Sequence, residues 1–226
     1  SFLAAVLGIN LEEIVESRIL PSHLRQKDKD DKLGILDVRV LLNNKEQIDI
    51  EIQVTSSEYW AERTLFYLGK MFVDQLKPGE DYQKLEKCIH VGILNFTLFD
   101  DQEYYSRFHF WSDQGRKMYS DKFEIHTLEL PKLAKHEYPE TELLKWLQFI
   151  NAETKEEFEM AAEKSEYIKK AYEDLNRISA DEEKRLEYEA RERAIRDHQY
   201  FSTVYKNTGL KEGRREGRSE EHTSEL

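Results

Sequence analysis

Hydrophobic and polar residues alternate without exception in the segment IDIEIQV, residues 48–54. Isoleucine and valine take the even positions, and Asp49, Glu51 and Gln53 take the odd ones. A period of two predicts a β-strand with one apolar face and one polar face. A similar run at residues 33–42 precedes it, and the short connection NNKEQ between the two runs predicts a β-hairpin.

The period changes after Ser57, where apolar residues recur at spacings of three and four up to Leu76. This pattern predicts a helix of about five turns, with Ser57 as its cap. The next segment, CIHVGILNF at residues 88–96, is almost wholly apolar. Such a run predicts a strand that is buried on both faces.

The rest of the chain adds smaller elements to this pattern. Residues 2–7 predict a short helix, and residues 19–32 predict a loop. The segments 104–111 and 122–130 predict a second hairpin, and helical spacing begins after Pro139. The order of these elements predicts a mixed α/β domain at residues 1–150, a charged helical extension at 151–207 and a flexible tail at 208–226.

The last nine residues differ in character from the rest of the chain. Residues 218–226, RSEEHTSEL, resemble a translated sequencing adapter, so we expect them to carry no function. The chain also begins at Ser1 rather than at methionine, which suggests that its true beginning is missing.

Composition argues against several classes of function and location. The formal net charge of -12 argues against broad adhesion to nucleic acid or to anionic membranes, but it leaves room for a small basic groove. Cys88 is the only cysteine, which excludes an internal disulfide and a cysteine-based zinc site. The longest apolar run, residues 2–9, is far shorter than the roughly 20 residues of a membrane span and does not resemble a signal peptide. We therefore expect a cytoplasmic protein that does not bind membranes.

The first hairpin gives the carboxylates of its strands a predicted geometry. Asp37 lies fourteen residues before Glu51, so the midpoint of the pair falls at Asn44, inside the turn. A three- or five-residue turn centred there places Asp37 directly across from Glu51, with Cβ atoms about 4.5–5.5 Å apart. A shift of one residue would move Asp37 to the other face of the sheet.

Two facing carboxylates suit a divalent cation, because Mg²⁺ prefers oxygen ligands and is often held by one or two carboxylates. A bound metal can make a water molecule nucleophilic and can stabilise charge on a phosphate. Gln53, on the same face, could orient that water through its amide. The alternative is that this polar face is only solvated, and the pattern alone leaves both interpretations open.

Three segments together resemble the Rpn family of recombination-promoting nucleases, also described as transposases, in the PD-(D/E)XK superfamily. The segments are GILDVRVLLNNKEQIDIEIQV (34–54), RTLFYLGKMFVDQLKPGEDYQKLEKCIHVGILNF (63–96) and LELPKL (128–133). The resemblance covers roughly residues 1–150. It implies a restriction-endonuclease-like core, in which a small mixed sheet is flanked by helices. It also implies a metal-dependent DNA endonuclease that hydrolyses phosphodiester bonds in recombination or transposition, with DNA as its partner and Mg²⁺ as its cofactor.

The family motif carries over residue by residue. It implies that Asp37 and Glu51 bind the metal and that Gln53 is the third catalytic residue. Glutamine departs from the lysine that is usual in the superfamily, and it cannot supply a positive charge. Four more residues match family patterns and are expected either to bind DNA and support the site or to serve only capping and packing: Arg63, Tyr67, Gln75 and Tyr82.

Several alternatives stay open at this point. Family members usually have an acidic helix ahead of SFLAAVLG, where this chain begins, so its activity without that segment is an open question. The fold could also serve as a non-catalytic module that binds DNA or protein, or as the scaffold for an interaction helix within residues 140–207. A homo-oligomer is likewise left open. Three histidines are interpreted as sheet residues with ordinary hydrogen-bond partners: His90, His109 and His126.

Overall fold

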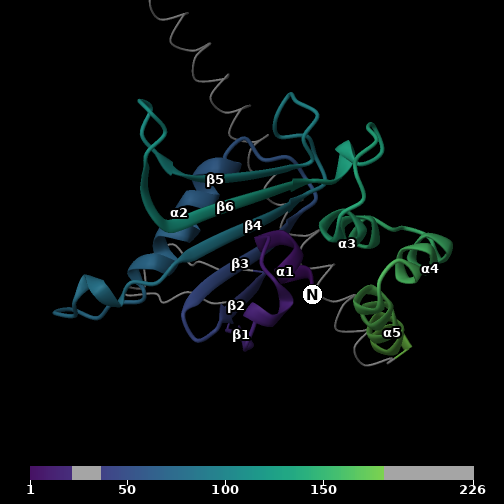
Figure 1. The fold of residues 1–226 in the computed structure, drawn as a ribbon, viewed down its shortest axis with the longest axis horizontal. Helices are drawn as coiled ribbons and strands as arrows, with labels where there is room; N and C mark the ends of the chain where they lie inside the picture. The colour runs from purple at the N-terminus through teal and green to yellow at the C-terminus, as the bar shows by residue number, and fades with distance from the viewer. Residues whose placement is uncertain (22–36, 181–226) are drawn as a thin grey trace, which may run out of the picture. The chain divides into compact units, whose positions relative to one another are not determined.

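The computed structural model describes residues 1–21 and 37–180, and Figure 1 shows its fold. The chain divides into two units, Ser1–Ser165 and Glu166–Leu226, and residues 166–180 are the described part of the second. The end of the helical extension and the tail at 208–226 lie outside the described residues, as does most of the loop expected at 19–32. The boundary expected at residue 150 stays a prediction.

The first unit contains a six-stranded mixed sheet in the order β1-β2-β3-β4-β6-β5. The strands are β1 (Ser17–Leu20), β2 (Val38–Leu42), β3 (Glu46–Gln53), β4 (Cys88–Leu94), β5 (Tyr105–Trp111) and β6 (Met118–Glu129). The neighbours β3, β4 and β6 are parallel, and the other neighbouring pairs are antiparallel. Strand β1 was not predicted, because residues 19 and 20 were assigned to a loop.

Helices cover both faces of this sheet, as Figure 1 shows with α1 in front and α2 behind. They are α1 (Phe2–Leu7), α2 (Trp60–Val73), α3 (Glu142–Ile150) and α4 (Lys155–Glu163), with short 3₁₀ turns η1 (Leu11–Glu13), η2 (Tyr82–Lys84) and η3 (Leu130–Lys132). A mixed sheet flanked by helices confirms the predicted α/β fold class and is consistent with a PD-(D/E)XK core.

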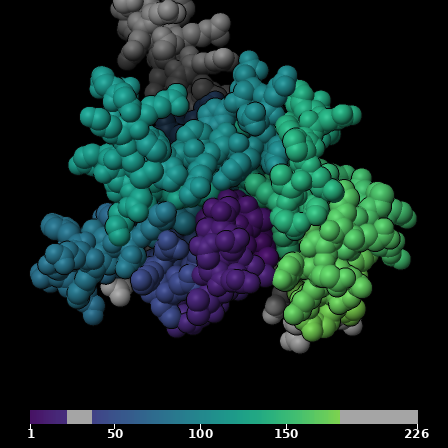
Figure 2. All heavy atoms as spheres, in the orientation of Figure 1, coloured from purple at the N-terminus to yellow at the C-terminus, as the bar shows by residue number. Residues whose placement is uncertain are grey.

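Each face of the sheet has its own apolar cluster. On one face, residues of α1 and α3 such as Val6 and Leu147 pack against Ile48 and Val91 of the central strands. On the other face, Leu68 and other residues of α2 pack against the start of β4. Figure 2 shows the atoms of α1, in purple, covering part of the visible face. We call these two sides the α1 face and the α2 face.

The first hairpin has the predicted register. Val38 pairs with Ile50 and Leu42 pairs with Glu46 across β2 and β3, so the three-residue turn is centred on Asn44. Asn43 and Asn44 both have positive φ, at 51° and 58°, a region that asparagine enters more readily than most residues. The turn is therefore built by the asparagines that marked it in the sequence.

Strand β4 is buried at all seven positions, as its apolar sequence predicts. It lies between β3 and β6, so both of its edges are paired and both of its faces are covered. The helix before it begins later than predicted, at Trp60 rather than near Ser57. The Ser57 hydroxyl instead accepts a hydrogen bond from the Tyr59 N–H at 3.3 Å, in a turn that precedes the helix.

The predicted second hairpin is also present, as β5 and β6. In the second unit, α5 (Glu166–Ala180) is an amphipathic helix with Arg177 paired to Asp174 on its surface. In the described part of the chain, no helix is both long enough and apolar enough to cross a membrane.

Candidate functional site

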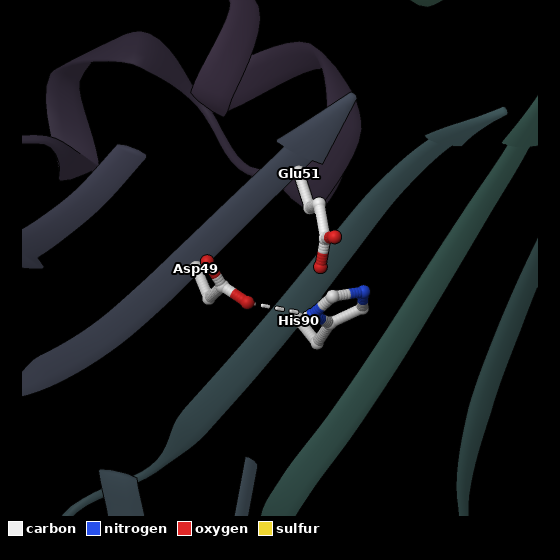
Figure 3. Close-up of side chains that lie close together, drawn as sticks. All are labelled: Asp49, Glu51 and His90. Atoms are coloured by element: carbon white, nitrogen blue, oxygen red, sulfur yellow. Dashed lines mark hydrogen bonds and ion pairs between the residues drawn. The ribbon is translucent and has the colours of Figure 1, made fainter. Parts of the chain in front are cut away.

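The polar face of β3 is buried rather than solvated. Asp49 is 0% exposed and Glu51 is 3% exposed, although both are acidic. They point to the α2 face, where residues of the helix cover them. Figure 3 shows both side chains projecting from β3 toward His90 of β4. A buried carboxylate requires hydrogen-bond partners, ion-pair partners or a bound cation, so the polar face of β3 is not simply solvated.

Asp49 and His90 meet because β3 and β4 are parallel and pair these two residues directly. The His90 Nδ1 lies 2.8 Å from the Asp49 Oδ2, and both side chains are fully buried. The other ring nitrogen, Nε2, lies 3.5 Å from the hydroxyl of Thr64 on α2. The expectation that His90 has hydrogen-bond partners is correct, and those partners place it beside the acids.

A glycine makes room for the residue that covers this site. Gly92 is the partner of Glu51 across the β3–β4 pair. A Cβ atom at Gly92 would lie 2.6 Å from Cζ2 of Trp60, a distance that real atoms do not reach. The Trp60 ring also packs against His90 at 5.6 Å and against Phe96 at 6.3 Å between centroids. Glycine here lets the indole lie directly over the strand next to Glu51.

Arg63 supplies the nearest positive charge to Glu51. Its guanidinium forms an ion pair with the Glu51 Oε1, and its other terminal nitrogen donates to the Gln53 Oε1 at 3.4 Å. The guanidinium also lies over the Tyr67 ring, 5.5 Å from the centroid. The Arg63 side chain is 39% exposed, so it reaches from the buried acid to the surface.

Burial is the main influence on the protonation of Glu51. Removal from water raises the pKa of this carboxyl above its ordinary value, and the negative charges of Asp49 and Asp37 raise it further. The positive charge of Arg63 acts in the opposite direction but does not reverse the effect. An additional cation nearby would therefore stabilise the ionised form of Glu51.

The donor set fits a divalent cation. Among the described residues, Asp49, Glu51 and His90 each offer a ligand atom within 4.8 Å of the others. The Asp49 Oδ1 and the Glu51 Oε2 are buried without a hydrogen-bond partner, and the Glu51 Oε1 has only the Arg63 ion pair. Unsatisfied buried oxygens are costly, and a hard cation such as Mg²⁺ would satisfy them. The residues present therefore fit a divalent cation.

Asp37 lies just before β2, and the register of the hairpin continues to place it opposite Glu51. Its side chain is exposed, and its Oδ2 accepts a hydrogen bond from the Ile52 N–H at 3.2 Å. Asp37 thus caps the end of the β2–β3 ladder, on the rim of the site rather than within the buried group. That it shares a cation with Glu51 stays a prediction.

The remaining expected residues divide between the site and its surroundings. Gln53, Arg63 and Tyr67 lie together with Glu51 through the contacts described above. Gln75 lies elsewhere: its amide exchanges hydrogen bonds with the Glu86 backbone at 2.8 and 3.1 Å and donates to the Cys88 Sγ at 3.1 Å. Tyr82 is 81% exposed on η2. Gln75 therefore braces the start of β4, at the opposite end of the strand from Gly92.

Sequence reasoning did not assign two members of the buried group. Asp49 was visible as part of the alternating polar face, two residues before Glu51, and that spacing was the available signal. His90 lies 41 residues from Asp49, and only the parallel pairing of β3 with β4 brings them together. No pattern within either strand predicts that pairing.

The comparison with protein families agrees with this architecture. No curated protein and no solved structure matches the chain. The sequence does match the family described as PD-(D/E)XK nuclease family transposase, over residues 1–203 of 226. The match spans the whole sheet, α2 and the acidic strand β3. The chain therefore belongs to the PD-(D/E)XK nuclease family of transposases.

Proposed function

We propose that this protein is a metal-dependent DNA endonuclease that hydrolyses phosphodiester bonds during recombination or transposition. The observation that carries the proposal is the buried Glu51, whose Oε2 lacks a hydrogen-bond partner, as does the neighbouring Asp49 Oδ1, and whose Oε1 has only the Arg63 ion pair. Family membership supports nuclease chemistry, and the unsatisfied oxygens support a cation as part of it.

Glu51 is the residue common to both possible ligand sets. With Asp37 it forms the pair expected from the family motif, and with Asp49 and His90 it forms the buried group. A divalent cation, Mg²⁺ in our proposal, would activate a water molecule and stabilise charge on the phosphate. Gln53 would orient that water, because it lies two residues from Glu51 on the same face of β3 and shares the Arg63 guanidinium with it.

A plasmid-nicking assay with Mg²⁺, with Mn²⁺ and with neither tests this function. We expect cleavage only with a metal, and we expect Glu51→Ala and Asp37→Ala to abolish it. Gln53→Ala should cause a smaller loss, because an amide that positions water contributes less than a metal ligand. Gln53→Lys should keep or raise activity by adding a cation near the developing charge.

The matched control is Asp113→Asn, which neutralises an exposed acid in the β5–β6 turn. It should cleave as the unsubstituted protein does. Full activity in Glu51→Ala at unchanged thermal stability would refute the proposed site. Binding of DNA without metal-dependent cleavage would favour a non-catalytic binding module instead.

A further inference from the structure

We propose that Arg63 and a divalent cation compete for Glu51, and that the cation releases Arg63 to bind a DNA phosphate. Metal binding and DNA binding would then be coupled through one side chain. The inference rests on the proposed function for its two ligands, the cation and DNA. It adds a regulatory step that the ligand set alone does not contain.

The contacts of Arg63 show what holds it at Glu51. The guanidinium forms its ion pair with a carboxylate that is 4% exposed, while the Arg63 side chain itself is 39% exposed. A guanidinium has five N–H donors, and the hydrogen bond to Gln53 is long, at 3.4 Å. Arg63 therefore has one strong attachment, and its other donors are only weakly engaged at the site.

A cation at Glu51 would weaken that attachment in two ways. It would take up the carboxylate oxygens with which the guanidinium pairs, and its double positive charge would repel the guanidinium at short range. Because Glu51 is buried, water would screen this repulsion less than it would at the surface. The Glu51 carboxylate therefore cannot bind the cation and the Arg63 guanidinium at full strength at the same time.

Tyr67 would keep the released side chain close to the site. The guanidinium already lies over the Tyr67 ring, 5.5 Å from its centroid, and a cation–π contact does not depend on Glu51. From that position the exposed part of Arg63 can reach a ligand in solvent. The planar fork of a guanidinium matches the oxygens of a phosphate, which makes the DNA backbone a suitable new partner.

The coupling has a measurable form. If the cation raises the affinity for DNA, DNA must raise the affinity for the cation by the same factor. Replacing Glu51 by glutamine should imitate the cation, because an amide no longer holds the guanidinium by charge. Replacing Arg63 by glutamine should remove the coupling.

The test measures binding of a fluorescently labelled DNA duplex by anisotropy, with and without Ca²⁺ in place of Mg²⁺ to limit cleavage. In the unsubstituted protein, we expect Ca²⁺ to raise DNA affinity about ten-fold. Glu51→Gln should bind DNA about ten-fold more tightly without Ca²⁺ and gain nothing from its addition. Arg63→Gln should bind weakly under both conditions.

The matched control is Glu62→Gln, which also removes one negative charge, from the exposed neighbour of Arg63 in α2, and leaves the Arg63–Glu51 pair intact. Without Ca²⁺ it should bind DNA as the unsubstituted protein does. Equal tightening of DNA binding in Glu62→Gln and Glu51→Gln would overturn the proposal, since it would reflect general electrostatics. A Ca²⁺ gain that persists in Arg63→Gln would overturn it as well.

Calorimetry gives a readout that does not involve DNA. Arg63→Gln should bind Ca²⁺ about ten-fold more tightly than the unsubstituted protein, because the competitor is gone. Unchanged or weaker Ca²⁺ binding would contradict competition. A protein that shows the expected binding pattern but cleaves nothing would refute the endonuclease function and leave this coupling in place. Failure of every variant to bind DNA would overturn the coupling.

Discussion

Two buried glutamates lie on opposite faces of the sheet, and their surroundings differ sharply. Glu124 of β6, on the α1 face, is 1% exposed, and both of its oxygens are paired. Its partners are Lys87 at 3.0 Å, Arg107 at 2.6 Å, His109 at 3.2 Å and His126 at 2.7 Å. Glu51, on the α2 face, has one ion pair and no hydrogen bond.

Burial acts to raise the pKa of both carboxyls, but their net pKa shifts have opposite directions. Burial alone would raise the pKa of Glu124, but the hydrogen bonds from His126 and Lys87 hold it far below its ordinary value. The pKa of Glu51 is raised, because burial outweighs the charge of Arg63. A fully paired buried acid stabilises a fold, whereas an incompletely paired one is a candidate for binding a ligand. The comparison therefore separates a structural acid from a candidate functional one.

The largest effect should come from Glu124→Gln. It leaves four basic groups around an uncharged amide, so we expect the free energy of unfolding to fall by about 3 kcal/mol in urea denaturation at neutral pH. The control is Glu137→Gln, an exposed acid, which should stay within about 0.5 kcal/mol of the unsubstituted protein. A loss below about 1 kcal/mol at Glu124 would remove the contrast with Glu51.

The next effect concerns the packing that covers Glu51. Gly92→Ala should lower the free energy of unfolding by about 2 kcal/mol, because the new methyl group must displace the Trp60 ring. Gly69→Ala, within α2, is the matched control. Its Cβ meets nothing within 4 Å, so helix propensity should stabilise the protein by about 1 kcal/mol. Tryptophan fluorescence should change in the first variant and not in the second.

Glu51→Gln should change stability much less than Glu124→Gln. It removes a buried charge that lacks hydrogen bonds, so we expect a free energy of unfolding that is equal or up to about 1 kcal/mol higher. The measurement is again urea denaturation, with Glu124→Gln run in parallel. A loss as large as that of Glu124→Gln would show that the Arg63 pair is structural and would end the distinction between the two acids.

The smallest expected effect is the pH dependence of the difference in free energy of unfolding between each glutamine variant and the unsubstituted protein. The folded pKa of Glu124 lies below the ordinary 4.5, so its stabilisation is full above that value and is lost as pH falls through the folded pKa. The folded pKa of Glu51 lies above 4.5, so its penalty is full above the folded pKa and disappears as pH falls toward 4.5.

Both variants should therefore approach the unsubstituted protein on acidification from about pH 7 to about pH 3, but from opposite sides. Glu124→Gln starts as the less stable protein, and Glu51→Gln starts as the equal or more stable one. Denaturation curves at several pH values would show this. Differences that do not change with pH would mean that neither effect comes from the charge of the carboxylate.

Local pattern predicted much of the fold. The alternation at 48–54 predicted β3, and the apolar run that begins at Cys88 predicted a strand buried on both faces. The turn residues around Asn44 predicted the register that places Asp37 opposite Glu51. Each of these depends on neighbours in sequence, where side-chain periodicity and turn chemistry act directly.

Local sequence patterns could not predict which residues meet in the buried clusters around Glu51 and Glu124. Asp49 meets His90 across 41 residues, and Glu124 meets Lys87 across 37, in each case through the pairing of parallel strands. A crossover connection does not encode its register in any local pattern, unlike a tight turn. His126 shows the same limit: its partner Glu124 is two residues away, but its other partner, the Tyr105 hydroxyl, comes from β5, 21 residues away.

The turn between β5 and β6 offers a practical handle on this protein. Residues 113–117 are exposed, and they precede β6, whose direction is parallel to β3 and β4. The turn therefore lies at the amino end of the parallel strands, while Glu51 lies near their carboxyl end. A fluorophore, an affinity tag or an inserted domain placed there would report on the molecule without touching the acids, because exposed turns tolerate insertion where buried backbone does not.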